Sequence, residues 1–319
     1  MLTENLKFVS TKDNVQIAIW HIFDSKKQQY LSNNSTYRAQ NIFLTHGTFS
    51  DKKTCLRIAE YLAILGHHCY IMEWRGHGAS SASKDKFNFE TIATYDFAAT
   101  FDYLCHQLNL DNLHCVTHSG GGIGLTMFLI QNPDYIDKIN SISLFACQAY
   151  GAALHPINRV KIFIAKYLNR LSGYIPAQKL KLGPVNESYH TMKQWYDWNL
   201  QQNFHSSFIK QGDTNKSDMN NNGVPHIISD TRPFDYRQHM PKITIPIYAI
   251  SAKGDQFISP TLGCRALFND FNNHANTFRE YSFSNGNLDD YTHSRILNSR
   301  HAAREVWPTV AAWIDKHSD

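Results

Sequence analysis

The chain has 319 residues, of which 42% are hydrophobic and 13% aromatic, so it can bury a large core in one or two domains. The formal net charge of +4 is small for this length and the basic residues form no long block, so nucleic acid is not an expected partner. No apolar run predicts an integral membrane segment and no signal-peptide pattern opens the chain, which makes the cytoplasm the expected location.

The cysteines indicate neither a disulfide framework nor a metal site. They lie far apart, without C-x-x-C spacing, at positions 55, 69, 105, 115, 147 and 264. Two of them, Cys69 and Cys115, stand inside apolar strand-like runs, so buried free thiols are expected. No group of His and Cys has metal-ligand spacing. We therefore expect no metal and no cofactor.

The N-terminal part of the chain predicts alternating strands and helices. Residues 6–10 and 15–21 read as an antiparallel hairpin at a sheet edge, and 25–40 reads as a polar loop. Further strands are predicted at 41–45, 68–74, 113–116 and 139–147, with helices at 55–65, 87–108 and 123–130 between them. This alternation favours a parallel sheet covered by helices on both faces.

The alternation of predicted strands and helices stops after residue 147 and returns at residue 243. The intervening segment, 148–242, predicts an insertion with a helix at 158–171 and an exposed, mobile loop at 213–223. A strand at 245–251, a helix at 260–271, a strand at 277–283, a loop at 284–294 and a closing helix at 301–317 follow. The predicted domains are thus a core made of 1–147 and 243–319, and an insertion of 148–242.

The stretch 113–125, LHCVTHSGGGIGL, predicts a strand, a tight turn and a helix, with Ser119 at the turn. A serine on such a turn has a strained backbone, and small neighbours let the strand and helix approach each other. The usual pattern is Gly-x-Ser-x-Gly, in which Gly121 matches and Thr117 replaces the first glycine. The amides at the helix N-terminus would stabilise negative charge beside Ser119, the candidate nucleophile. A flexible glycine loop without chemistry is the alternative.

A serine nucleophile needs a base that takes its proton and an acid that orients the base. In parallel sheets such groups gather at the carboxyl ends of strands, where Asp255 and His293 are expected. A solvated turn aspartate and an exposed loop histidine are the plain alternatives for these two residues. Weaker candidates for the two roles are Asp289, Asp290, His301, which opens a helix, and His118, which should point to the other side of its strand.

The oxyanion formed during acyl transfer needs two backbone amides close to the serine. One belongs to the residue after the serine, Gly120, and the other to a loop after an earlier strand, where Thr48 stands. Gly47 would let that loop turn close to the site. His46 is expected to pack beneath the loop.

With these features the chain resembles the α/β-hydrolase superfamily, specifically its serine esterase and lipase-like branch. The resemblance rests on His46-Gly47-Thr48, Arg75-Gly76-His77-Gly78-Ala79-Ser80, Thr117-His118-Ser119-Gly120-Gly121, Gly254-Asp255, and His293 followed by 303–308 and Trp313. It covers nearly all of the chain except the insertion, which falls where the family places its variable cap.

The resemblance implies a mostly parallel central sheet flanked by helices, with a helical cap insertion. It also implies Ser119 as nucleophile, His293 as general base and acid, Asp255 as the orienting acid, and the Thr48 and Gly120 amides as oxyanion donors. The predicted function is hydrolysis of small-molecule carboxylic esters, or thioesters, of apolar acyl groups through an acyl-enzyme. An acyltransferase, a small-amide peptidase with the same triad, and a catalytically silent ligand-binding protein are the alternatives.

The predicted helix 158–171 is amphipathic. Its apolar stripe comprises Ile157, Val160, Ile164, Tyr167, Leu168 and Leu171, and basic residues stand between them. We expect this stripe to pack inside the cap rather than to lie on a membrane surface.

Overall fold

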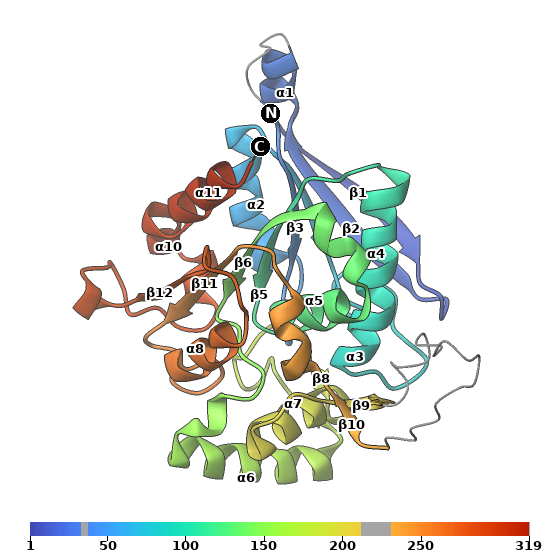
Figure 1. The fold of residues 1–319 in the computed structure, drawn as a ribbon, viewed down its shortest axis with the longest axis vertical. Helices are drawn as coiled ribbons and strands as arrows, with labels where there is room; N and C mark the ends of the chain where they lie inside the picture. The colour runs from blue at the N-terminus through green and yellow to red at the C-terminus, as the bar shows by residue number, and fades with distance from the viewer. Residues whose placement is uncertain (33–37, 212–230, 319) are drawn as a thin grey trace, which may run out of the picture.

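The computed structural model describes residues 1–32, 38–211 and 231–318. An eight-stranded sheet forms the centre, in the order β1-β2-β4-β3-β5-β6-β11-β12 (Figure 1). The strands are β1 Leu2–Ser10, β2 Gln16–Asp24, β3 Asn41–Thr45, β4 His68–Met72, β5 Leu113–His118, β6 Ile139–Phe145, β11 Ile247–Ala252 and β12 Thr277–Tyr281. The loop predicted at 213–223 lies outside the described residues.

The sheet is parallel from β4 to β12. The strand β1 pairs antiparallel with β2, and β2 pairs antiparallel with β4, so the predicted hairpin does form one edge of the sheet. The other neighbouring strands run parallel, which brings the carboxyl ends of β3, β5, β6 and β11 to one side. This arrangement confirms the predicted fold.

Side chains alternate between two cores because successive residues of a strand face opposite sides of a sheet. In β3, Ile42 and Leu44 join one buried cluster and Phe43 joins the other. The first cluster lies under α2 Lys53–Leu65, α9 Arg295–Asn298, α10 Arg300–Glu305 and α11 Trp307–Lys316. The second lies under α3 Phe89–Thr91, η1 Ile92–Phe97, α4 Ala98–Asp102, η2 Tyr103–Gln107, α5 Gly120–Gln131 and α8 Thr261–Asn269.

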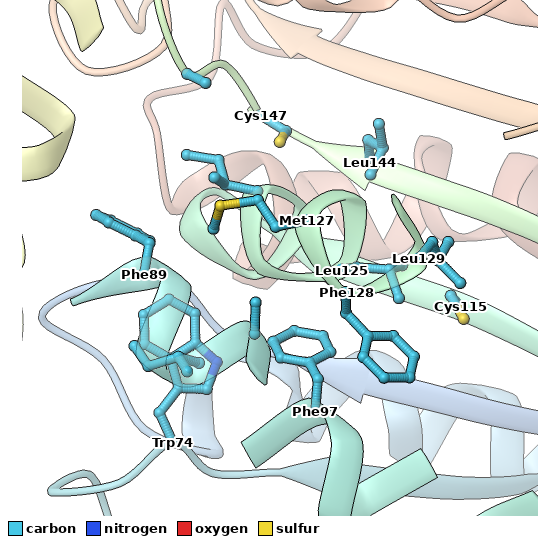
Figure 2. Close-up of a cluster of buried hydrophobic side chains, with 14 of the residues drawn as sticks. Trp74, Phe89, Phe97, Cys115, Leu125, Met127, Phe128, Leu129, Leu144 and Cys147 are labelled. Carbon is cyan, nitrogen blue, oxygen red and sulfur yellow. The ribbon is translucent and has the colours of Figure 1, made fainter. Parts of the chain in front are cut away.

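The helix α5, which follows Ser119, is buried on all sides. Figure 2 shows Trp74, Phe89 and Phe97 on one side of it and Leu144 and Cys147 on the other. All of these side chains belong to the same buried cluster. The position of Ser119 is therefore fixed by the core rather than by a surface loop.

Two expectations for secondary structure are wrong. Residues 25–40 were expected to form a loop, but Ser25–Ser32 forms the helix α1, where Asp24 Oδ1 accepts a hydrogen bond from the Lys27 amide at 3.0 Å. A carboxylate at that position satisfies an amide that the helix leaves unpaired. The closing helix is broken into α10 and α11, because Pro308 stands in the first turn of α11 and has no N–H with which to continue α10.

The segment 148–242 joins β6 to β11. Its elements are η4 Ala152–Leu154, α6 Pro156–Ser172, β7 Tyr174–Ile175, β8 Glu187–Ser188, α7 Tyr189–Gln201, β9 His205–Lys210, β10 Pro233–Asp235 and η6 Tyr236–Lys242. Shorter pieces of the core are η3 Pro133–Lys138 and η7 Phe283–Asn285. In Figure 1, α6 lies along the lower edge of the molecule with α7 directly above it.

The expectation that the apolar stripe of α6 packs inside is also wrong. Every one of its members is exposed, from 50% for Ile164 to 71% for Leu171. The side of α6 that packs inward carries Asn158 and Ile162 instead, and the Asn158 amide donates to the Gln256 carbonyl at 2.7 Å. A buried asparagine is stable there because its polar group is paired.

The cysteines are all buried and free, as expected.

Candidate active site

Ser119 stands at the junction between β5 and α5 in a strained conformation. Its backbone has φ 53° and ψ −122°, a region that residues other than glycine rarely adopt. The turn is tied down by a hydrogen bond from the Ser119 amide to the Phe145 carbonyl at 2.8 Å. The residue is buried, with 7% of its surface exposed, and it lines a cavity. Strain of this kind persists only where the surrounding structure enforces it, as α5 and β6 do here.

The loop after β3 touches the Ser119 turn. A Cβ atom on Gly47 would lie 2.7 Å from Ser119 Cβ and 3.0 Å from the Gly120 amide nitrogen, so only glycine fits at this position. Thr48 and Gly120 line the same cavity as Ser119. The two residues expected to supply amides are therefore brought together with the serine.

Thr117 fits into the turn despite its size. It is fully buried, and its Oγ1 would lie 3.1 Å from a Cβ atom built on Gly122. A side chain at Gly122 would therefore crowd Thr117 as well as Cys147 and Leu144. The threonine does not prevent Ser119 from adopting its strained backbone.

Asp255 and His293 form a direct hydrogen-bonded pair. His293 Nδ1 lies 2.5 Å from Asp255 Oδ2, and the carboxylate also accepts the amides of Ile258 and Ser259 at 3.1 Å each. Burial raises the pKa of Asp255, but the charge and hydrogen bond of His293 and the two amides outweigh it, so the pKa lies below the ordinary value of 3.8. Asp255 is therefore a carboxylate that holds His293 through Nδ1.

The other carboxylates near His293 have different partners. Asp290 Oδ1 accepts the Phe283 amide at 2.8 Å, and Asp289 pairs with Arg295. His301 lies 3.7 Å from Asp289. None of these contacts places an alternative acid on His293.

His118 lies against His293, which the sequence did not indicate. The two ring centroids are 4.7 Å apart, and His118 Nε2–H donates to the His293 carbonyl at 2.9 Å. Burial, together with the nearby charge of His293, lowers the pKa of His118 to about 3. His118 is thus a neutral imidazole that holds the backbone of His293 close to the Ser119 turn.

Glu187 supports the loop that carries Thr48, a role that the sequence did not indicate. Its Oε1 accepts the Phe49 amide at 3.3 Å and lies 2.8 Å from His77 Nε2. The Phe49 carbonyl accepts the Val185 amide at 3.2 Å, so β8 and the residues before it hold both polar groups of Phe49. Glu187 lies 138 residues beyond Phe49, and no local pattern connects them.

His77 completes this support. Its Nδ1 donates to the Arg75 carbonyl at 2.9 Å, while its Nε2 faces the Glu187 carboxylate. Burial lowers the pKa of His77, but Glu187 and the Arg75 carbonyl outweigh that effect, so the pKa is raised above 6.5. A protonated His77 can donate to both partners at once. His46, which was expected to pack beneath the loop, is fully buried, and its ring lies 5.2 Å from that of His77.

The cavity beside Ser119 is mainly apolar. It has a volume of about 190 Å³ and is lined by Phe89 and Ile123 from the core and by Ile175, Met192 and Trp195 from the segment 148–242. Such a lining suits an apolar group of a ligand, with the few polar groups at Ser119 fixing its orientation.

Within residues 1–32, 38–211 and 231–318, no three His, Cys, Asp or Glu side chains gather closely enough to hold a metal ion. A helix long and apolar enough to cross a bilayer is likewise not found in that part of the chain.

Comparison with known proteins identifies the family of the chain. No curated protein matches the sequence. An esterase from Exiguobacterium antarcticum superposes with a TM-score of 0.59 at 14% identity, covering 97% of this chain and 99% of that one. Alpha/beta hydrolase domain-containing protein 10 from mouse gives 0.60 at 13% identity, covering 98% and 100%. A monoacylglycerol lipase from Paleococcus ferrophilus gives 0.57 at 16%, covering 88% and 97%.

At these identities the superpositions show a shared fold. The sequence adds an independent finding, because residues 40–283 match the family described as the alpha/beta hydrolase fold. That match spans most of the 319 residues. The chain therefore belongs to the α/β-hydrolase family.

Proposed function

We propose that this chain is a serine hydrolase that cleaves carboxylic esters, or thioesters, of apolar acyl groups. The observation that carries the proposal is the strained Ser119 at the edge of an apolar cavity, next to His118, whose ring holds the backbone of the hydrogen-bonded His293 of the His293–Asp255 pair. Esters with apolar acyl groups fit the cavity lining. The esterase and lipase among the similar structures agree with this chemistry.

In the proposed first step, Ser119 Oγ attacks the ester carbonyl while His293 Nε2 takes the hydroxyl proton. Asp255 holds Nδ1–H, which fixes the tautomer and stabilises the charged ring. The amides of Thr48 and Gly120 donate to the negative oxygen of the tetrahedral intermediate. The intermediate then expels the alcohol, which receives its proton from His293, and Ser119 is left acylated.

In the second step, water attacks the acyl group on Ser119 and gives its proton to His293. The acid leaves and Ser119 recovers its proton. We further propose that the segment 148–242 is a cap, since its residues Ile175, Met192 and Trp195 line the cavity over Ser119. A cap of this kind excludes water from the developing charge and selects the acyl group.

The test is hydrolysis of acetyl, butyryl and octanoyl p-nitrophenyl esters by the wild type and by Ser119→Ala. The wild type should turn over at least one chain length, and the variant should lose about a thousandfold or more in kcat, because loss of the nucleophile leaves only residual catalysis. Circular dichroism checks that the variant is folded. A folded wild type that hydrolyses none of these esters, or a variant with near wild-type activity, contradicts the proposal.

A further inference from the structure

The outward side of α6 is an apolar surface with no partner among the described residues. We define the α6 face as the exposed residues Ile157, Val160, Phe163, Ile164, Tyr167, Leu168 and Leu171. Phe163 is 63% exposed and Leu171 is 71% exposed. Single exposed apolar residues are common, but a contiguous row of this kind marks an interaction site.

The opposite side of α6 is already packed. Ile162 is fully buried, and the Asn169 amide donates to the Tyr196 hydroxyl at 2.6 Å. With 3.6 residues per turn, Asn158, Ile162 and Asn169 fall on one side of the helix and the α6 face falls on the other. The α6 face is therefore not needed for the fold, and something outside the described chain would cover it.

Positive charge surrounds the α6 face. At the same helical spacing, the exposed Lys161 lies along one edge of the face, and the exposed Arg159 and Arg170 lie along the other. Residues 154–186 contain no Asp or Glu, and they also include Lys166, Lys179 and Lys181. Lys166 forms an ion pair with Asp197 of α7. The α6 face thus has an apolar centre and basic edges.

We propose that the α6 face docks on the surface of an anionic lipid bilayer. An amphipathic helix with exposed aromatic and aliphatic residues and basic residues beside them lies in the interface, with its apolar side among the acyl chains and its basic side chains on the headgroups. A second copy of this chain is a poorer fit. In a two-fold contact through the α6 face, the basic edges of both copies would meet without acidic residues from 154–186 to pair with them.

The cavity beside Ser119 lies beneath α6, on the inward side of the helix, where Ala165 and Asn169 line it. Leu180 is 56% exposed and Leu182 is 40% exposed, and both also line the cavity beside Ser119. They belong to the same acid-free stretch as the α6 face. Delivery of an apolar ester from the bilayer to Ser119 would rest on the proposed hydrolase function, whereas docking itself does not.

Docking is tested by sedimentation of the full chain with vesicles of phosphatidylcholine alone and of phosphatidylcholine mixed with phosphatidylglycerol. The wild type should bind the anionic vesicles at least tenfold more tightly, and added salt should weaken that binding. Ser119→Ala should bind like the wild type. Because this variant carries no catalytic serine, failure of docking and failure of the proposed hydrolase function are separate results.

Two double variants separate the apolar and the basic contributions. Phe163→Ser with Leu171→Ser removes apolar contact, and Lys161→Gln with Arg170→Gln removes two charges. Each should weaken binding about tenfold or more, since one basic residue near an anionic surface contributes about fivefold. The matched controls are Leu262→Ser with Phe283→Ser, at residues that are exposed to a similar degree, and Lys53→Gln with Lys316→Gln. Both controls should bind like the wild type.

The targeted side chains are exposed, so these variants should keep the wild-type melting temperature. No binding of the wild type to anionic vesicles overturns the proposal, as does binding that both α6 double variants leave unchanged. Light scattering supplies a further check. A dimer that becomes monomeric in Phe163→Ser with Leu171→Ser would assign the α6 face to a second copy and overturn lipid docking.

Discussion

His118 Nε2–H donates to the carbonyl of His293 at 2.9 Å, and the rings of the two residues lie against each other. His118 is the residue before Ser119 on the chain, so this contact links the proposed nucleophile and the proposed base through a buried neutral imidazole. Because Asp255 holds His293 by its ring and His118 holds it by its backbone, His293 is fixed at two points. Its position thus depends on β5 as well as on its own loop.

The buried histidines predict a loss of stability in mild acid. Burial lowers the pKa of His118 to about 3 and those of His21 and His114 to about 4. The unfolded chain takes up protons near pH 6.5 and the folded chain does not, so their contribution is complete above 6.5 and declines as the pH falls toward these values. For His118 the loss by pH 3 is on the order of a few kcal/mol. His77 has the opposite effect on stability. Because its pKa is raised, its stabilising contribution is retained in acid and is lost only as the pH rises.

Thermal unfolding between pH 7.5 and pH 4.5 checks this expectation. The melting temperature of the wild type should fall steadily below pH 6.5, and His118→Gln should show a shallower fall because it lacks one of the buried histidines that resist protonation. A melting temperature that is constant or rises on acidification would show that these histidines are protonated in the folded chain.

Asp255, the proposed acid, should affect kcat far more than Asp290 does. Asp255→Asn should lower kcat by roughly 10³-fold to 10⁴-fold with the fold retained, since an amide cannot hold His293 in the same tautomer or stabilise its charge. Asp290→Asn should change kcat little, because the carboxylate of Asp290 accepts the Phe283 amide and does not hold the ring of His293. His301→Ala serves as a second mild control. Steady-state kinetics on one ester suffice, and a harmless Asp255→Asn beside a damaging Asp290→Asn would reverse the assignment.

Glu187 should act as a positioning residue for the loop of Thr48. Glu187→Ala removes the acceptor of the Phe49 amide, so we expect kcat to fall about tenfold or more while KM changes little, as for a weakened oxyanion contact. Glu187→Gln keeps an oxygen acceptor and should retain most of kcat, although its loss of charge leaves His77 without an anionic partner.

The control for the Glu187 variants is Glu280→Ala, in the edge strand β12. Thermal unfolding is measured beside the kinetics, because removing one partner of a buried ion pair also costs stability. If Glu187→Ala and Glu187→Gln lose stability but keep kcat, Glu187 contributes to the fold and not to the position of Thr48.

Local signals allowed much of the fold to be predicted. The strand, turn and helix around Ser119 lie within 113–125, and the apolar runs of β3, β5 and β11 mark buried parallel strands without distant information. Asp255 and His293 could be named because both follow strands that end at one edge of the sheet. Their hydrogen bond, however, joins residues 38 positions apart and is a property of the folded chain.

Tertiary contacts explain what could not be predicted. A helical pattern identifies an apolar side of α6 but not what that side faces. The opposite side faces inward, where the buried Asn158 and the half-buried Asn169 make hydrogen bonds. Glu187 looks like an ordinary surface residue in the sequence, yet it is buried between Phe49 and His77. His118 was expected to face away from the site, and its pairing with a backbone carbonyl 175 residues distant left no local trace.

The most direct test of the proposed function is covalent labelling of the folded full chain with a fluorophosphonate probe, followed by mass spectrometry of its peptides. Such a probe reports an activated serine whatever the natural ester is. We predict one adduct per chain, located on Ser119, with no adduct in Ser119→Ala and strongly slowed labelling in His293→Ala. A folded wild type that takes up no label, or one labelled on another serine while Ser119→Ala is labelled equally well, would contradict the assignment of Ser119 as the nucleophile.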